Sequence, residues 1–327
     1  MKIGKVPENV LKRSVMKQLH YKRDEVILGP GIGEDCAALA LAEDEILVMS
    51  TDPITGTAKD IGKLAIQITA NDLASAGAEP IGVMLTILLP DGTREIALKR
   101  IMEQMECACR EAKMQILGGH TEVTAVVNQP VVNVAGVAKA KKGSLISTAG
   151  ARAGMDIVVS KWVGIEGTMI FAKEKEAELK EHFPGGFVDT AIGFDRYLSV
   201  VPEAAVATQS SVAAMHDVTE GGLFGALWEM AEASGVGLEI DLKKIPIRQE
   251  TVEICEYFDV NPYGLISSGM MLMASADGNA LVLALQEAGI PATVIGKATE
   301  GNDRVIIRDE ERRFLEPPKT DELYKVL

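Results

Sequence analysis

Two patterns of apolar and polar residues recur along the first half of this chain. Continuous apolar runs of five to nine residues are typical of buried strands, and apolar side chains at helical spacing are typical of amphipathic helices. Thr93 is placed to cap the longest of these helices. The predicted strands are residues 46–50, 81–89, 115–117 and 131–138, and the predicted helices are residues 1–20, 62–76 and 93–113.

The same alternation resumes after residues 139–154, a stretch rich in Lys, Gly and Ser that predicts a domain joint. Here Thr219 is placed to cap a helix that reaches Ser234, and Trp228 falls on the apolar face of that helix. The predicted strands are residues 156–160, 212–215, 238–241, 270–274 and 293–298, and the predicted helices are residues 167–179, 219–234, 248–257 and 279–288.

A chain of 327 residues exceeds the size at which a single hydrophobic core is usual. Strands and helices are mixed in both halves. We therefore expect an α/β (α+β) protein of two domains, residues 1–148 and 149–327.

Composition narrows the classes of function. A formal net charge of -14 and the lack of a Lys/Arg stripe disfavour binding to nucleic acid. An acidic protein can still bind a polyanion such as ATP if a divalent cation neutralises the charge. No apolar stretch reaches the roughly 20 residues of a membrane span, and the first residues lack an apolar signal segment. These features predict a cytoplasmic protein with no membrane partner.

The candidate chemistry is carried by glycines and aspartates. Gly31 and Gly33 form a loop that allows close approach of a ligand, although a plain tight turn would look the same. The loop lacks the pattern of a dinucleotide fingerprint, and the chain has no P-loop. Asp35 follows the loop, Asp52 ends a strand, and Asp72 lies near a helix end. Each aspartate taken alone could have no role beyond accepting hydrogen bonds in a turn or at a helix cap. Together, however, the three carboxylates are natural ligands for a hard cation.

Two further side chains are candidate site residues because of where they lie relative to the predicted strands and helices. Asp217 ends a strand immediately before a predicted helix, and His216 beside it either orients that carboxylate or closes the strand. His120 lies in a predicted loop after Gly118 and Gly119. Because loops often carry function, His120 is a candidate site residue, with a turn hydrogen bond as the alternative.

Five segments also carry a resemblance to a known family. In this order they resemble the motifs of the aminoimidazole-ribonucleotide synthetase (PurM-like) superfamily. That superfamily includes thiamine-monophosphate kinase, selenophosphate synthetase and the hydrogenase-maturation protein HypE, to which the resemblance is greatest. The segments are GPGIGEDCA at 29–37, STD at 50–52, GKLAIQITANDLASAGAEP at 62–80, GGHTEVT at 118–124 and HDVTEGGLFGALWEMAEASGVGLEI at 216–240.

The resemblance implies a two-domain fold whose N-terminal domains pair into a shared β-barrel in a homodimer, with ATP near the interface. It implies that Asp35, Asp52 and Asp72 hold Mg²⁺ on the ATP phosphates, and that Asp217 faces the same cleft. Members of the superfamily use ATP to phosphorylate a substrate oxygen or selenide, a reaction that positioned magnesium ions promote. The implied nucleotide contacts are Gly31, Gly33, Lys63, Asn71, Gly118, Gly119 and Thr121.

Some positions depart from the HypE pattern. HypE has Gly-Asp-Thr-Lys where this chain has Gly119-His120-Thr121-Glu122, and Asn-Glu-Gly-Lys where it has residues 267–270, Ser-Ser-Gly-Met. Imidazole is a poor ligand for magnesium but can handle protons, so His120, Glu122 and Asp217 are the catalytic candidates. HypE acts on its own C-terminal cysteine, whereas the last Cys here is Cys255, so we do not expect the HypE reaction to be the leading function.

The sequence therefore predicts a Mg-ATP-dependent phosphotransferase or ATP-activating synthetase that acts on an unidentified small substrate. One alternative is a nucleotide-binding module without catalysis that works through a protein partner. Another is a maturation enzyme of the HypE or selenophosphate-synthetase type, although the latter uses a reactive N-terminal cysteine and Cys36 lies inside the glycine-loop motif.

Overall fold

The computed structural model describes residues 4–5, 8–30, 37–54, 60–210, 212–317 and 320–327. The chain divides into two compact units. The first comprises Met1–Ala74 and Ala78–Leu145, and the second comprises Ser75–Gly77 and Ile146–Leu327. Among the described residues no helix is both long and apolar enough to cross a membrane.

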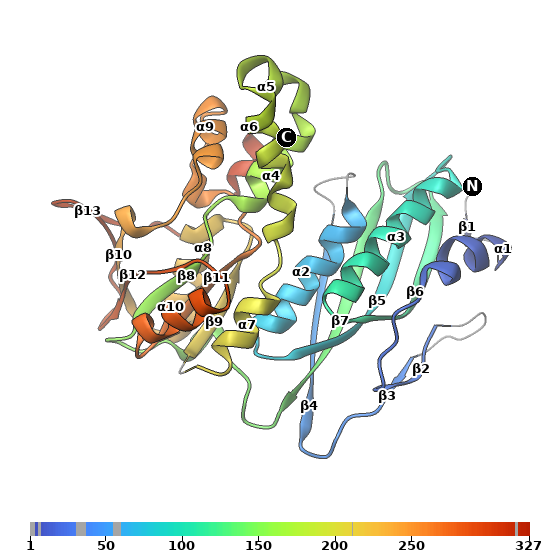
Figure 1. Ribbon diagram of the computed structural model, residues 1–327, viewed down its shortest axis with the longest axis horizontal. Helices are drawn as coiled ribbons and strands as arrows, with labels where there is room; N and C mark the ends of the chain where they lie inside the picture. Colours follow the sequence, from blue (N-terminus) through green and yellow to red (C-terminus); the bar gives the residue numbers. More distant parts are fainter. Residues whose placement is uncertain (1–3, 6–7, 31–36, 55–59, 211, 318–319) are drawn as a thin grey trace. The chain divides into compact units, whose positions relative to one another are not determined.

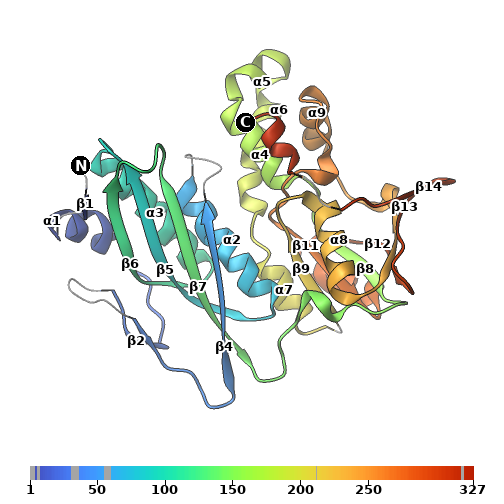
Figure 2. The same cartoon turned by 180° about the vertical axis from the view of Figure 1, so that it is seen from behind.

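The first unit is built on a five-stranded sheet, one face of which is covered by two helices (Figures 1 and 2). Strands β5 and β6 are parallel, and the other neighbouring pairs are antiparallel. In spatial order the strands are β1 (Gly4–Lys5), β6 (Gln115–Thr124), β5 (Glu79–Pro90), β7 (Val131–Lys141) and β4 (Glu45–Ile54), and the helices are α2 (Ile61–Ser75) and α3 (Glu95–Glu111).

Gly136 shows which face of this sheet the helices cover. A Cβ at Gly136 would collide with the Thr69 side chain of α2, so this position of β7 faces the helix. Gly136 is paired with Ser50 on β4 and with Val83 on β5, which therefore face the same side. The opposite face carries the exposed side chains Leu47 and Met49.

The segment before β4 forms short elements along the first unit. A turn of α-helix leads into a π-helical and a 3₁₀ segment, and a two-stranded hairpin follows. These elements are α1 (Glu8–Val10), η1 (Leu11–Val15), η2 (Met16–Gln18), β2 (Val26–Leu28) and β3 (Ala38–Leu39).

The second unit contains a seven-stranded sheet. A large aliphatic cluster fills the side of the sheet on which α8 (Gly222–Ser234) packs, and Trp228 packs against it as predicted. In spatial order the strands are β14 (Glu311–Phe314), β13 (Arg304–Arg308), β10 (Gly237–Asp241), β12 (Ala292–Thr299), β8 (Asp156–Ser160), β11 (Met270–Ser275) and β9 (Val212–Val218). The other helices are α4 (Ile165–Glu174), α5 (Glu176–His182), α6 (Gly185–Ile192), α7 (Val201–Ala207), α9 (Gln249–Tyr257) and α10 (Gly278–Glu287), and the 3₁₀ segments are η3 (Thr148–Gly150), η4 (Gly193–Tyr197), η5 (Leu242–Lys244), η6 (Pro262–Gly264) and η7 (Glu322–Lys325).

Several local predictions were wrong. The single helix expected at residues 167–179 is the pair α4 and α5. Thr93 does not cap α3: Arg94 occupies the N-cap position, and the Thr93 hydroxyl donates to the Pro90 carbonyl of the preceding turn. Thr219 does not cap α8 either, because Gly221 is the N-cap, with φ of 83°, and the Thr219 carbonyl accepts a hydrogen bond from Gly222.

Candidate functional site

Two of the predicted carboxylates lie on the helix-covered face of the first sheet. The Ser50 hydroxyl donates to Oδ2 of Asp72 across 2.5 Å, so this part of β4 faces α2. Asp52 is two residues further along β4, and alternate residues of a strand share a face. Asp52 therefore lies on the same side of the sheet as Asp72, and its side chain is partly exposed at the edge strand.

Helix α2 carries two of the predicted nucleotide contacts, Lys63 and Asn71, together with the predicted metal ligand Asp72. Asn71 is fully buried beside Asp72 in the sequence. Lys63 precedes Asp72 by nine residues, which corresponds to about 13 Å along the axis and to about half a turn around it. Lys63 and Asp72 therefore project from opposite sides of the helix. Its neighbour Gly62 packs against the Ile101 carbonyl of α3, where a Cβ would lie 2.5 Å from the oxygen, so this Gly-Lys pair is not part of a P-loop.

The predicted loop at residues 118–121 is instead part of strand β6, which continues to Thr124. Gly118 pairs with Met84, and Gly119 pairs with Leu85 of the neighbouring parallel strand. Gly119 has φ of 151°, and a Cβ there would collide with the Leu85 carbonyl. Gly119 allows close approach of β5, so pairing between strands decides the conformation that the sequence alone suggested was a loop.

His120 and Glu122 form an exposed pair, with Nε2 and Oε2 separated by 3.2 Å. His120 pairs with Thr86 of β5, three residues after Val83, so it lies on the face away from the helices. β6 and β4 are also separated by two strands, which places their axes about 14 Å apart. Within one chain the structure thus separates this pair from Asp52. Thr121, between the two residues, is buried.

Three predicted residues, Gly31, Gly33 and Asp35, lie outside the described residues, and their role stays a prediction. Among the residues that are described, no cluster of three or more His, Cys, Asp or Glu side chains could hold a metal ion. Magnesium usually takes one or two carboxylates and completes its octahedron with water and phosphate oxygens. The pair Asp52 and Asp72 on one face fits that pattern.

Asp217 lies on β9, the edge strand of the second sheet, and its side chain is buried. His216 does not orient it, because adjacent residues of a strand point to opposite faces. The His216 Nε2 contacts Glu229 Oε2 at 2.8 Å, and Nδ1 lies 3.4 Å from the Thr148 hydroxyl.

Sequence reasoning missed a buried ion pair in the second unit. Lys161 Nζ lies 2.6 Å from Glu203 Oε1 and donates to the carbonyls of Tyr197, Ser199 and Gly269. Burial lowers the pKa of Lys161, and Glu203 opposes that change. The contacts join the end of β8 to the segment that precedes β11. No motif signalled them, because the partners are 36 to 108 residues apart in sequence.

A second missed group is Glu166, in the first turn of α4. It is buried, and its Oε2 has no hydrogen-bond partner within the described part of the chain. Burial raises the pKa of Glu166 to about 7, while the Ser268 hydroxyl and amide beside it act in the opposite direction and the Asp321 carboxylate adds to the rise. Asp321 itself accepts hydrogen bonds from the amides of Gly221, Ile266 and Leu323.

Comparison with known proteins identifies the family. Residues 33–140 match the N-terminal domain of AIR synthase related proteins, and residues 152–309 match their C-terminal domain. The carbamoyl dehydratase HypE of Cupriavidus necator is 33% identical over 82% of this chain and 77% of its own length. This chain belongs to the AIR synthase-related family. A putative hydrogenase expression/formation protein of Methanocaldococcus jannaschii, 29% identical over 99% of this chain and 97% of its own, is another relative.

Solved structures agree with this family assignment at the level of fold. The crystal structure of E. coli HypE has a TM-score of 0.82 and 24% identity, covering 98% of this chain and all of its own. A HypE structure in complex with ATP has a TM-score of 0.78 and 21% identity, covering 98% and 97%. The predicted two-domain PurM-like α/β fold is confirmed.

Proposed function

We propose that this AIR synthase-related chain is a Mg-ATP-dependent enzyme that transfers or activates a phosphoryl group on a small substrate. The observation that supports this most is the pair Asp52 and Asp72 on one face between β4 and α2, in a chain that matches both domains of the family. A similar protein has been crystallised with ATP. We take residues 1–148 as the nucleotide domain and residues 149–327 as the second domain.

In this proposal the two carboxylates, with Asp35, hold the magnesium ion, which neutralises charge on the transferred phosphoryl group when it is bound. Ser50 donates a hydrogen bond to one oxygen of Asp72 and so orients this carboxylate. The fully buried Asn71 lies next to Asp72 on α2 and is the second nucleotide contact on this helix. Asp217, with His120 and Glu122, remains the proposed proton-handling set.

The uncovered face of the first sheet favours assembly of two copies. His120 and Glu122 lie on the sheet face that no helix covers, and the same face exposes Leu47 at 49% and Met49 at 62% of their surfaces. Exposed apolar side chains on an uncovered sheet favour burial against another surface. A second copy that packs on this face would cover these apolar side chains, so we propose a homodimer that buries this face.

The direct test is ATP consumption by the purified chain with Mg²⁺, screened against carboxylate, amide and phosphate substrates. Asp52→Asn and Asp72→Asn should each abolish turnover while circular dichroism and thermal unfolding stay close to wild type. Asp91→Asn, in the exposed turn after β5, is the matched control and should retain activity. Turnover in both site variants at the wild-type rate would refute the assignment, and Mg-ATP binding without any turnover would support the non-catalytic module.

The second candidate is the carbamoyl dehydratase activity named for the relatives. It requires a cysteine as acceptor, but of the described cysteines Cys109 and Cys255 are buried and burial raises the pKa of both thiols, that of Cys255 to about 12. Cys107 alone among the described three is exposed. Intact-mass analysis after incubation with ATP and a carbamoyl donor would reveal modification of a thiol, and an added carbamoyl or cyano group would favour this second candidate.

A further inference from the structure

The edge strand β9 depends on β11 for its place in the second sheet. β9 is the last strand in the spatial order, and β11 is its neighbour there. Asp217 of β9 is paired with Met271, and Val218 is paired with Met270, so Asp217 lies beside the first residues of β11. The backbone position of Asp217 therefore follows the position of the start of β11.

The start of β11 is held by side chains from the end of β8. The backbone ladder between β8 and β11 ends at Leu272 and does not include Met271. At that point the Met271 amide donates to the Ser160 hydroxyl oxygen at 3.0 Å. Lys161 Nζ donates to the carbonyl of Gly269, immediately before β11, at 2.9 Å. These two contacts extend the hold of β8 over the part of β11 that lies beside the carboxylate of β9.

Lys161 brings three backbone carbonyls together around one ammonium group. Its Nζ donates to the carbonyls of Tyr197, Ser199 and Gly269 at 2.6 to 3.0 Å. Gly269 has φ of 102°, and a Cβ there would collide with the Tyr197 carbonyl oxygen. The turn before β11 is thus packed against a carbonyl that Lys161 also binds, and this leaves the turn little freedom to move.

Glu203 of α7 joins the two side chains of β8. Its Oε1 lies 2.6 Å from Lys161 Nζ and accepts a hydrogen bond from the Ser160 hydroxyl at 3.3 Å. The side chains of Lys161 and Glu203 are 10% and 0% exposed, so solvent screens their attraction less than that of a surface pair. Ser160, Lys161 and Glu203 form one enclosed group, which we call the Lys161 cluster.

The Lys161 cluster and Asp217 lie on the same face of the second sheet. Val159 of β8 belongs to the aliphatic cluster on the α8 side, so Ser160 faces the other side. His216 contacts Glu229 of α8, and its neighbour Asp217 therefore also faces away from α8. β11 lies between β8 and β9, whose axes are about 9.5 Å apart. The backbone of β11 thus connects the cluster to Asp217.

We propose that Lys161 is a positioning residue for phosphoryl transfer, which fixes the start of β11 and thereby the place of Asp217. This inference rests on the proposed function, in which Asp217 handles protons. Lys161 touches no reacting atom in this role. Its removal should lower kcat and leave the affinity for Mg-ATP unchanged, because the proposed nucleotide contacts belong to the first unit.

The test uses Lys161→Met/Glu203→Leu in the full-length protein, because the paired replacement removes the ammonium without leaving a carboxylate buried alone. Arg304→Met is the control. Arg304 is also a buried cation that contacts a glutamate, Glu232, but it lies on β13, towards the opposite edge of the sheet from β9. Calorimetric titration gives the Kd for Mg-ATP, release of ADP from Mg-ATP gives kcat, and hydrogen exchange reports on the amides of β9 and β11.

The paired replacement should lower kcat about tenfold, a fraction of what a positioned proton-transfer group typically contributes, with Kd within about twofold of wild type. Ser160→Ala should lower kcat by a smaller factor, since it removes one of the two contacts to β11 and keeps the ion pair. Exchange at 214–218 and 270–272 should rise in both variants. Arg304→Met should leave kcat and this exchange unchanged.

Asp217→Asn separates positioning from a general loss of stability. In the wild-type background it should lower kcat about 100-fold. Added to Lys161→Met/Glu203→Leu it should lower kcat only about tenfold further, because the paired replacement has already removed part of what Asp217 contributes. Two independent effects would multiply instead.

Wild-type kcat in the paired variant, an equal loss in Arg304→Met, or losses that multiply with that of Asp217→Asn would overturn the inference. If the paired variant does not fold, wild-type kcat in Ser160→Ala has the same consequence. Failure of the proposed function has a different signature, because the wild-type chain itself would then not turn over Mg-ATP. The positioning role would fall with it, while faster exchange in the variants would show only that the Lys161 cluster holds β9 and β11.

Discussion

Replacement of Glu166 by Gln is expected to stabilise the second unit at alkaline pH and to have no such effect at acidic pH. In the folded chain this carboxyl is buried, and its pKa is about 7 instead of 4.5. Between these two pH values the folded state binds more protons than the unfolded state, so the stability of the wild type falls as pH rises. Gln has nearly the same shape and no charge, and it removes that dependence.

The magnitude follows from the two pKa values. One pKa unit corresponds to 1.36 kcal/mol, so ionisation of Glu166 in the folded state costs up to about 3 kcal/mol once the pH exceeds 7. The relative advantage of Glu166→Gln over wild type should therefore increase by up to about 3 kcal/mol between pH 4.5 and pH 8. Any constant cost of burying an amide shifts the whole curve and leaves its slope unchanged.

Urea unfolding at pH 5, 6, 7 and 8 tests this expectation, followed by tryptophan fluorescence. Both tryptophans of the chain, Trp162 and Trp228, belong to the second unit, so the signal reports on the unit that contains Glu166. Glu174→Gln, an exposed position on the same helix, is the control and should change stability by no more than about 0.5 kcal/mol. A difference between Glu166→Gln and wild type that is the same at every pH would refute the reasoning.

Three further predictions concern packing, the buried ion pair and assembly. Gly136→Ala should destabilise the first unit by about 1–3 kcal/mol because the new methyl group meets α2, whereas Gly185→Ala, with no atom within 4 Å of its Cβ, should have little effect; urea unfolding measures both. Lys161→Met should cost about 3–5 kcal/mol, since it leaves the Glu203 carboxylate buried without its cation, and adding Glu203→Leu should recover much of the loss in the same assay. Met49→Lys should shift the chain from dimer to monomer in sedimentation velocity if the uncovered sheet face is the interface. A Met49→Lys variant that still sediments as the wild-type dimer would exclude that face.

The sequence determined the positions of most strands and helices, because side-chain periodicity reflects which faces are buried. Residues 81–89 form a continuous apolar run, and the structure shows why: β5 lies between β6 and β7 and faces two helices. The ordered motifs also identified the superfamily, since several segments in one order are unlikely to coincide by chance. Asp52 and Asp72 could be proposed as partners from these motifs alone.

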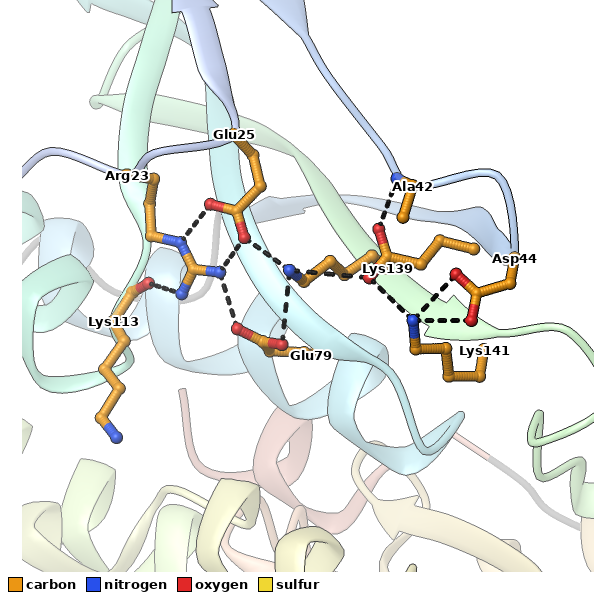
Figure 3. A network of polar contacts seen from close by, with 9 residues as sticks. Arg23, Glu25, Ala42, Asp44, Glu79, Lys113, Lys139 and Lys141 are labelled. Atoms are coloured by element: carbon orange, nitrogen blue, oxygen red, sulfur yellow. Dashed lines mark hydrogen bonds and ion pairs between the residues drawn. The ribbon is translucent and has the colours of Figure 1, made fainter.

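Tertiary structure decided what local patterns could not. Gly118 and Gly119 are typical of a turn, but pairing with β5 makes them part of a strand and places His120 on the sheet face away from Asp52. The Lys161–Glu203 pair and the raised pKa of Glu166 arise from burial among segments distant in sequence, which periodicity does not report. Likewise Glu25 and Lys139 are 114 residues apart, and only the packing of the segment before β2 against the sheet brings them into contact (Figure 3).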